Sequence, residues 1–592
     1  MLRCDHLVSW MGVWLVMGAC TASAADESSS PAAIRTELKA RGLTVSRATA
    51  ETAGGGLDID VQRDVVYAIN GDRKMTADVF LPRGDSKRPR PAVLVVHGGG
   101  WLKGDKAKFH HLAAVLARRG FVAVSVGYRL GGEAKFPAAV HDCNAATRWL
   151  RSSAERYRVD PKRIGAVGGS AGGHLVGLMA AAPHAAALQG NGGHAGVSSR
   201  LQAAVVLAGP MQLTTGPVAR KSREQPESSN ANKWFGKTLD QAPGLYKLGA
   251  PFTHFSAKTP PMLFMRGQYD DPPANIQGRA RLAGHKVSTR ATVYFRGRHG
   301  CWNQHPWFDV MADDIDAFLS RHLGDPTPGQ LIPWTSGWLT QEGVDVYRSA
   351  DRIELVVAAV VPNRVLKLPR LNNPVKSVEI INPELRNSKQ RKLQIAPKPA
   401  HWEIRLPQVE LASPLRLRIT TVGRPWSARL PRVAVPATAS SDTILLGAHD
   451  ANVVGQHLRY EPQPHKNTVG YWSRIEDWCW WNVYVERPGR YQVGVLQGCG
   501  KGHGGSRVEV RLAGQKLAFT VEDTGGFQAF RQRTIGQVTI SRPGLYSFEI
   551  RPLSKKTIAV MDVRQAQLKW VAPAGESVGT LSGESRALSA TR

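Results

Sequence analysis

The residues with the clearest potential for chemistry lie in the stretch 165–177, GAVGGSAGGHLVG, where one serine stands among six glycines. Within it, residues 168–172 read Gly-Gly-Ser-Ala-Gly and fit the pattern G-x-S-x-G. A serine on a sharp turn from a strand into a helix needs small residues two places before and after it, because the two elements approach closely there. The pattern predicts Ser170 as a nucleophile on such a turn.

Other readings of glycine-rich loops fit this chain less well. A phosphate-binding loop needs a lysine after its last glycine, but the similar stretch 99–104 is followed by Asp105. A dinucleotide fingerprint needs G-x-G-x-x-G, which neither glycine cluster contains. On this motif alone, a structural turn without a catalytic serine remains the alternative.

A second glycine cluster, His97-Gly98-Gly99-Gly100-Trp101, follows the apolar run 92–96. Hydrolysis of an ester passes through a tetrahedral oxyanion, which is stabilised by backbone N–H groups already aimed at it. Consecutive glycines let the main chain come close to a substrate. We therefore predict the N–H groups of Gly98, Gly99 and Ala171 as the oxyanion hole, with His97 as a structural residue of the loop.

An acid and a histidine follow two later strand patterns. Asp270 comes after the apolar run 261–266, and His299 comes after the run 293–295. The chain order Ser, Asp, His is the one expected when a G-x-S-x-G serine belongs to a parallel sheet. His299 would take the proton from Ser170, and Asp270 would orient the imidazole and stabilise its charged form.

Neighbouring residues offer alternatives for these two roles. Asp271 adjoins Asp270, but the spacing after Gly267 favours Asp270 as the acid. His305 is interpreted as a structural or pocket residue, and Cys301 as a packed thiol, since it lacks a comparable turn. The 18 histidines show no metal-ligand spacing, so we predict neither a metal nor another cofactor.

The region 61–323 must position these side chains, and in it short apolar strands alternate with helical patterns. Such alternation predicts an α/β domain with a doubly wound, mainly parallel sheet covered on both faces. Residues 138–157 and 308–323 carry apolar residues at helical spacing. The predicted strands are 92–97, 121–126, 164–168, 203–207, 262–265 and 292–295.

The character of the chain changes after a linker at residues 324–329. Residues 330–430 and 443–571 show strand patterns without convincing helices and predict two all-β sandwich modules, separated by a break rich in Pro, Ala and Ser at 431–442. The tail 572–592 is expected to be disordered. In the first module the predicted strands are 353–361, 377–381, 392–395, 402–406 and 415–421.

Turn signals in the second module predict hairpins at residues 487–490 and 542–544. A regular hairpin at the first turn would bring Cys479 and Cys499 close together, which leaves open a disulfide or two buried thiols.

The N-terminus has the order of a secretory signal peptide, with Arg3, an apolar run and small residues before a polar segment. We expect residues 1–24 to be removed, a polar leader at 25–60, and a secreted or periplasmic protein. A lipid anchor at Cys20 is the less favoured alternative. No later stretch is long and apolar enough to span a membrane.

The formal net charge is +30, but the excess is spread along the chain. No nucleic-acid-binding signature accompanies it, so we do not expect nucleic acid as a partner. The charge is interpreted either as a contribution to solubility or as attraction to an anionic glycan or envelope surface.

The motifs HGGGW at 97–101, FPAAVHDC at 136–143 and DPKRIGAVGGSAGGHL at 160–175 resemble those of alpha/beta-hydrolase esterases and lipases. The similarity covers about residues 61–323 and includes enzymes like bacterial feruloyl and acetyl-xylan esterases and hormone-sensitive lipase. It implies a serine triad and an acyl-enzyme, and it leaves the substrate open.

The two β modules also carry resemblances. Residues 330–430 resemble the small β-sandwich behind alpha-L-fucosidase catalytic domains, and residues 443–571 resemble galactose-binding-type sandwiches of carbohydrate-active enzymes. Aromatic rings offer flat faces on which sugars stack. The candidates for sugar binding, which core packing could equally explain, are Trp472, Trp478, Trp480 and Trp481.

Together these features predict a secreted serine carboxylic-ester hydrolase without a cofactor. Its partner would be a small-molecule or polysaccharide ester, with acetyl or feruloyl esters of polysaccharide favoured. The alternatives are a lipase or generalist carboxylesterase, a peptidase of the same fold, and a glycan-binding protein with an inactive hydrolase domain.

Overall fold

The computed structural model describes residues 30–574, apart from 53–56, 85, 87, 271–274, 325–331, 334–342, 350, 359–360, 409–413, 428–429 and 439. The predicted signal peptide, Asp271 and nearly all of the tail therefore lie outside the described residues.

A mixed sheet forms the centre of the N-terminal part, with the strand order β2-β3-β5-β4-β6-β7-β8-β9. Strands β4 to β9 are parallel, whereas β2 and β3 are antiparallel to their neighbours. This arrangement confirms the predicted α/β fold class. The strands are β2 (Ile59–Asn70), β3 (Arg73–Pro82), β4 (Arg90–Val96), β5 (Val122–Val126), β6 (Val159–Gly169), β7 (Ala203–Leu207), β8 (Met262–Gly267) and β9 (Thr289–Tyr294).

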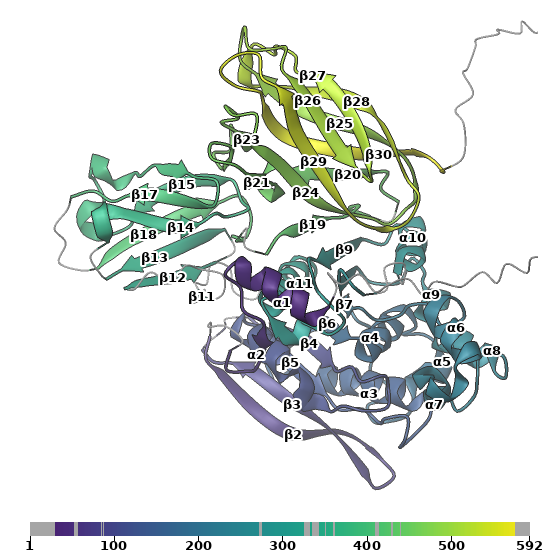
Figure 1. Ribbon diagram of the computed structural model, residues 1–592. Coiled ribbons are helices and arrows are strands. Elements are labelled where there is room, and N and C mark those ends of the chain that lie inside the picture. The colour runs from purple at the N-terminus through teal and green to yellow at the C-terminus, as the bar shows by residue number, and fades with distance from the viewer. Residues whose placement is uncertain are drawn as a thin grey trace, which may run out of the picture.

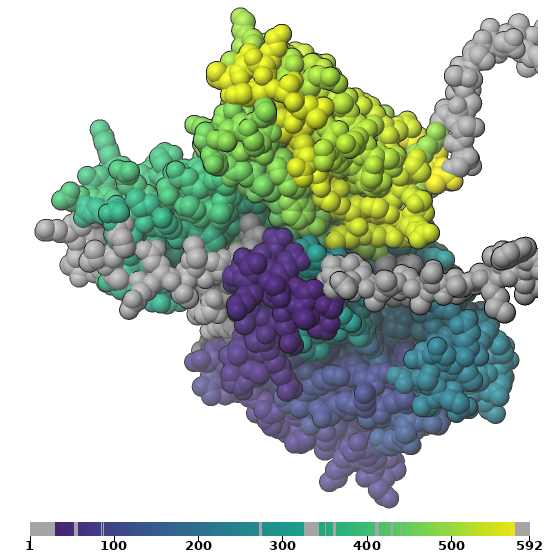
Figure 2. Space-filling model, viewed as in Figure 1, coloured from purple at the N-terminus to yellow at the C-terminus, as the bar shows by residue number. Residues whose placement is uncertain are grey.

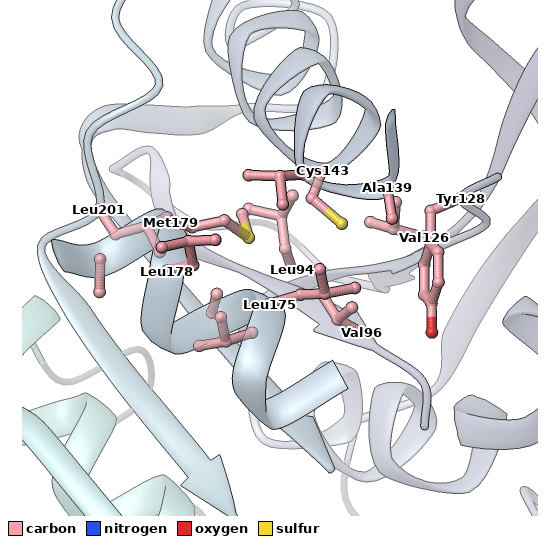
Figure 3. Packing of buried hydrophobic residues seen from close by; sticks show 14 of the residues in the cluster. Leu94, Val96, Val126, Tyr128, Ala139, Cys143, Leu175, Leu178, Met179 and Leu201 are labelled. Carbon is pink, nitrogen blue, oxygen red and sulfur yellow. The ribbon is translucent and has the colours of Figure 1, made fainter. Parts of the chain in front are cut away.

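Helices cover both faces of this sheet because the central strands are apolar on both sides. Helices α3 (Ala138–Ser152) and α4 (Ala171–Ala181) pack on one face. Helices α2 (His110–Arg118) and α11 (Trp307–Leu323) pack on the other. Figure 3 shows the first layer, where side chains of β4 and β5 meet those of α3 and α4.

Several short helices lie between the strands of the second half of this sheet. Trp234 from one of them, α7 (Asn230–Phe235), stacks on Trp101 of the glycine loop 97–101 with ring centroids 5.1 Å apart. Helix α5 (Ala186–Gln189) precedes β7, and the helices after β7 are α6 (Gly216–Glu224), α7, α8 (Pro243–Gly249), α9 (Pro251–His254) and, after β8, α10 (Ile276–Gly284).

The segment expected as a polar leader contains packed structure. Helix α1 (Pro31–Ala40) buries Ile34 and Leu38, one helical turn apart, against the α2–α11 side of the sheet. Strand β1 (Ser46–Arg47) pairs with β10 (Gln304–His305). The polar composition that predicts a leader at 25–60 gave no sign of this packing, because two well-spaced apolar residues are enough to anchor a short helix on an existing core.

The middle module consists of two small sheets, ordered β11-β12-β13-β18-β15 and β14-β17-β16. Its strands are β11 (Ile332–Pro333), β12 (Val344–Arg348), β13 (Arg352–Val357), β14 (Val365–Pro369), β15 (Val375–Ile380), β16 (Ile395–Pro397), β17 (His401–Arg405) and β18 (Leu415–Thr421). Figure 1 shows this module beside the N-terminal α/β domain, with the third part of the chain above both.

The C-terminal β-sandwich has two layers, and its two predicted hairpins are wrong. Strand β24 (Trp478–Val485) pairs with β29 (Gly544–Ser554), whereas β25 (Gly489–Cys499) pairs with β28 (Gly526–Ile540) and β30 (Asp562–Ala572). Both turns therefore carry the chain from one sheet to the other. The remaining strands are β20 (Thr443–Gly447), β21 (Asn452–Val454), β22 (Arg459–Glu461), β23 (Thr468–Gly470), β26 (Arg507–Leu512) and β27 (Gln515–Thr520).

The break at 431–442 is also more than a linker. Within it, β19 (Arg432–Ala434) pairs antiparallel with β9 of the N-terminal domain and parallel with β24 of the sandwich. One 14-stranded sheet therefore runs from the N-terminal domain into the sandwich. The Pro- and Ala-rich composition hid a three-residue strand, which is too short for a periodic pattern.

Cys143, Cys301, Cys479 and Cys499 are buried free thiols, so the two cysteines of the sandwich form no disulfide. Within the described part of the chain, no helix is long and apolar enough to cross a membrane.

Candidate active site

Ser170 stands on a strained turn between β6 and α4. Its φ of 55° and ψ of −120° are uncommon for a residue with a side chain. A Cβ on Gly168 would lie 2.3 Å from the oxygen of Gly172, and a Cβ on Gly172 would lie 2.1 Å from the oxygen of Val96. Helix α4 therefore approaches β6 at Gly168 and β4 at Gly172 so closely that glycine is required at both positions of the predicted motif.

The structure brings Ser170, His299 and Asp270 together in one hydrogen-bonded chain. His299 Nε2 lies 3.0 Å from Ser170 Oγ, and His299 Nδ1 lies 2.6 Å from Asp270 Oδ1. The carboxylate is 6% exposed and the imidazole 55% exposed. A buried acid thus meets a histidine that is open to solvent and to any ligand above Ser170.

The turn after β8 determines where Asp270 lies. The N–H of Gly267 donates to Asp270 Oδ2 at 3.0 Å, which leaves Oδ1 for the imidazole. Gly267 packs directly on the backbone of Gly297, since a Cβ there would lie 2.4 Å from its carbonyl atoms. This contact joins the loop that carries the acid to the loop that carries His299.

The glycine loop after β4 lies against the serine. A Cβ on Gly98 would lie 3.1 Å from Ser170 Cβ, so the backbone of this loop borders the reacting atom. Gly99 has φ +147° and packs on the carbonyl of Lys103, where no side chain fits. Ala171 is the first residue of α4, whose N-terminus begins beside Ser170. The roles of these three N–H groups stay predictions.

His97 is buried below this loop. Burial lowers its pKa to about 4, although a hydrogen bond with the carbonyl of Gly98 opposes the shift. Its ring stacks on Tyr128 with centroids 4.3 Å apart. A neutral, packed imidazole fits the structural role expected from the sequence.

A pocket of about 320 Å³ opens beside the histidine and the acid. Its walls are largely apolar, and amide side chains and one guanidinium interrupt them. Of the lining residues, the sequence predicted only Asp270 and His299 as site residues, since no local motif marks loop positions that converge only in the fold. The pocket is lined by Ala208, Pro210, Gln212, Thr215, Gly216, Pro217, Val218, Arg266, Asp270, Asn275, Gln277 and His299.

His305 and Cys301, which lie near His299 in the sequence and were not assigned to the triad, make structural contacts. His305 bonds to Asp309 and Thr52, at 2.8 and 3.1 Å. Cys301 is buried with its sulfur 3.9 Å from that of Met311, and burial raises the pKa of its thiol well above the ordinary range. Among the described residues, no group of three or more His, Cys, Asp or Glu side chains could hold a metal ion.

Two of the four sugar-binding candidates are wrong. Trp472 and Trp481 are at most 1% exposed, and their indole N–H groups donate to backbone carbonyls within the sandwich. The guanidinium of Arg551 lies over the ring of Trp478, 3.4 Å from its centroid. Trp480 is half-buried on β24 and remains a candidate.

The strand order and the strained serine between β6 and α4 define an alpha/beta hydrolase. Residues 77–279 match the BD-FAE family, and residues 456–572 match a domain of unknown function, DUF5077.

Two curated relatives narrow the assignment from the alpha/beta-hydrolase fold to esterases. The chain is 30% identical over 321 residues to the probable carboxylic ester hydrolase LipM of Mycobacterium tuberculosis, covering 48% of this chain and 69% of the relative. It is 28% identical over 264 residues to esterase LipQ of the same organism, covering 44% of this chain and 61% of that relative's length. The chain therefore belongs to the alpha/beta-hydrolase esterase family.

Among solved structures, a truncated carbohydrate esterase from gut microbiota is 23% identical. The match covers 45% of this chain and 99% of that chain, with a TM-score of 0.40.

Proposed function

We propose that this protein is an exported serine carboxylic-ester hydrolase that acts through Ser170, His299 and Asp270. The observation that carries the proposal is the hydrogen-bonded chain from Ser170 Oγ through His299 to Asp270, at 3.0 and 2.6 Å. A serine hydroxyl is a weak nucleophile unless a positioned base removes its proton as it attacks.

In the first half of the proposed reaction, Ser170 Oγ forms a bond to the ester carbonyl carbon while its proton passes to His299 Nε2. The Nδ1–H of His299 donates to Asp270, whose negative charge stabilises the imidazolium. The N–H groups of Gly98, Gly99 and Ala171 would stabilise the oxyanion. His299 then returns the proton to the leaving alcohol as the carbon–oxygen bond breaks.

In the second half, water attacks the acyl group on Ser170 and gives its proton to His299. The tetrahedral intermediate collapses, the carboxylic acid leaves, and Ser170 Oγ regains the proton. This sequence requires water to reach the imidazole, which the 55% exposure of the His299 side chain permits.

For the substrate we propose an acylated polysaccharide carrying acetyl or feruloyl esters. The exposed histidine leaves room for a bulky alcohol, and two β modules of a kind found beside carbohydrate-active domains support a glycan substrate by analogy. The close alternative is a lipase or generalist carboxylesterase. The apolar walls of the pocket of about 320 Å³ support it, because such walls would accommodate an acyl chain.

Export is proposed from the signal-peptide pattern of residues 1–24. Mass spectrometry of the mature protein would test it: a new N-terminus near Ala25 supports export, and an intact Met1 contradicts it. A lipid-modified Cys20 would instead establish anchoring.

Hydrolysis of p-nitrophenyl acetate by wild type and Ser170→Ala tests the reaction. We expect the variant to lose at least about a thousandfold in kcat. Equal rates would reject the triad, and an inactive wild type would favour the glycan-binding alternative. Release of acetate or ferulate from acylated xylan, compared with triglycerides and peptide p-nitroanilides, then separates esterase, lipase and peptidase.

A further inference from the structure

The β-sandwich inserts a buried carboxylate into the hydrolase domain. Glu486 directly follows β24 and is 7% exposed. Its Oε1 and Oε2 lie 2.7 and 2.6 Å from Nη1 of Arg279, which is 1% exposed. Oε1 also lies 3.9 Å from Nη2 of Arg266. One acid of the sandwich therefore meets two arginines of the hydrolase domain.

These two arginines flank the triad acid along the chain. Arg266 belongs to β8, four residues before Asp270, and Arg279 belongs to α10, nine residues after it. Arg266 lines the active-site pocket together with Asp270 and His299. The same arginine lines a small cavity with Arg279 and Glu486. One carboxylate therefore contacts an arginine that precedes Asp270 in the sequence and another that follows it.

The sandwich adds further contacts at this point. The ring of Tyr484 lies under the guanidinium of Arg266, with its centroid 4.6 Å from Cζ. The carbonyl of Pro436, just after β19, accepts from Nη2 of Arg279 at 3.4 Å. Because β19 joins the two parts into one sheet, Glu486 is placed by backbone pairing as well as by its own ion pair.

The buried arginines of this arrangement need the negative charge of Glu486. Burial lowers the pKa of Arg279 from its ordinary value, and Glu486 opposes that shift. A buried charge without a partner is strongly unfavourable. Without the carboxylate, the two arginines would turn toward water or other acceptors, and Arg266, which lines the pocket with Asp270 and His299, would be held there less firmly.

We infer that Glu486 is a positioning residue of the esterase site, supplied by the C-terminal β-sandwich, and that it holds Asp270 in place through Arg266 and Arg279. The sandwich would then support the active site through Arg266, which lines the pocket, although no described residue of the sandwich lines it. This inference rests on the proposed esterase function, because it concerns the geometry of the same triad.

The test compares kcat and KM of wild type and Glu486→Gln on p-nitrophenyl acetate at a temperature where both are folded. We expect kcat to fall by at least about tenfold, since a shift of 1 Å at a catalytic group can cost a hundredfold. KM for so small an ester should stay within twofold. An unchanged kcat in folded Glu486→Gln would overturn the inference.

Two further variants separate positioning from general stability. Glu486→Asp keeps the charge and withdraws it by one methylene, so it should lose less kcat than Glu486→Gln. Arg348→Gln breaks a buried ion pair between the hydrolase domain and the middle module and should lower stability without lowering kcat. A parallel loss of kcat in Arg348→Gln would assign the effect to stability and overturn the inference.

The pair itself is tested by a double-mutant cycle with Arg279→Gln. If Glu486 acts through Arg279, the two losses in kcat will be less than additive. Full additivity would contradict this route. Failure of the proposed function is distinguishable, since it would show as a wild type no faster than Ser170→Ala, and the inference would fall with it.

Discussion

The two β modules dock on the hydrolase domain by the same device in opposite directions. At the middle module, the hydrolase domain supplies the carboxylate: Asp313 of α11 meets Arg348 of β12 at 2.5 Å and Arg424 at 3.6 Å. At the sandwich, the module supplies the carboxylate, Glu486, and the hydrolase domain supplies the arginines. Figure 2 shows the middle module and the sandwich beside each other on the same side of the hydrolase domain.

The two contacts differ in their position relative to the active-site pocket. The residues that line the active-site pocket include Arg266 from the Glu486 contact, and among the described residues they include none from the Asp313 contact. Both contacts should contribute to stability. Only the Glu486 contact should also affect the rate of the reaction, because its arginines flank Asp270.

The largest effect should come from the acid that Glu486 is inferred to position. Asp270→Asn removes the charge that stabilises the imidazolium, and kcat should fall by about 10⁴-fold. This loss, measured with p-nitrophenyl acetate, sets a ceiling for Glu486→Gln. A variant that kept more than a tenth of the wild-type kcat would remove Asp270 as the triad acid and leave Glu486 nothing to position.

Asp313→Asn should affect stability only. It leaves Arg119, Arg348 and Arg424 facing an uncharged amide, and the free energy of unfolding in urea should drop by about 3–5 kcal/mol. Burial alone would raise the pKa of Asp313, but Arg348, Arg119 and Arg424 outweigh it and lower the pKa. Its contribution is therefore present above the unfolded pKa and lost as the pH falls through the folded one. A tenfold loss of kcat at full folding would break the contrast between the two contacts.

The contribution of Asp562 in the sandwich to stability should change with pH in the direction opposite to that of Asp313. Burial and the nearby Glu461 raise the pKa of Asp562 to about 8, while Lys466 opposes the shift. The folded protein then keeps a proton that the unfolded chain loses near pH 4, so stability should fall between about pH 4 and 8, by up to about 5 kcal/mol. Thermal unfolding across this range should show the decline in wild type and not in Asp562→Asn. An equal decline in both would reject this assignment.

The smallest effect on stability and kcat is expected for the ion pair of Arg487, the residue after Glu486. Arg487 pairs with Asp442 at 3.2 Å, and both side chains are more than half exposed. Asp442→Asn should change the free energy of unfolding by less than about 1 kcal/mol and leave kcat unchanged. A loss comparable to that of Glu486→Gln would show that burial does not distinguish the two neighbouring ion pairs.

Most of the hydrolase fold was predictable because its signals are local. The strand 203–207 and the start of the helix at Ala138 agree with β7 and α3, and the fold class was confirmed. The glycines of the serine turn were predictable from the G-x-S-x-G motif, but only the steric exclusion at Gly168 acts within that motif, whereas a Cβ at Gly172 would meet Val96 and His97 of the earlier strand and loop. The catalytic assignments of Ser170, Asp270 and His299 stay predictions until activity is measured.

Pairing between distant strands was not predictable. The sequences at 487–490 and 542–544 show that the chain reverses, but a Pro-Gly turn carries no information about which strand pairs with the next. The choice between a hairpin and a crossing to the other sheet depends on which surface buries Trp481 and the neighbouring apolar residues. Only the packed sandwich decides it.

The sequence by itself determined which reactive residue types the chain contains and where they stand: a serine on a glycine-flanked turn, an acid and a histidine in the expected order, and the strands that carry them. Local sterics and apolar periodicity are sufficient for those statements. Only the tertiary structure decided that β19 joins two domains into one sheet and that Glu486 lies against Arg279. The pairing of β19 with β9 and the contact of Glu486 with Arg279 each join residues more than about a hundred positions apart, whose proximity no local pattern records.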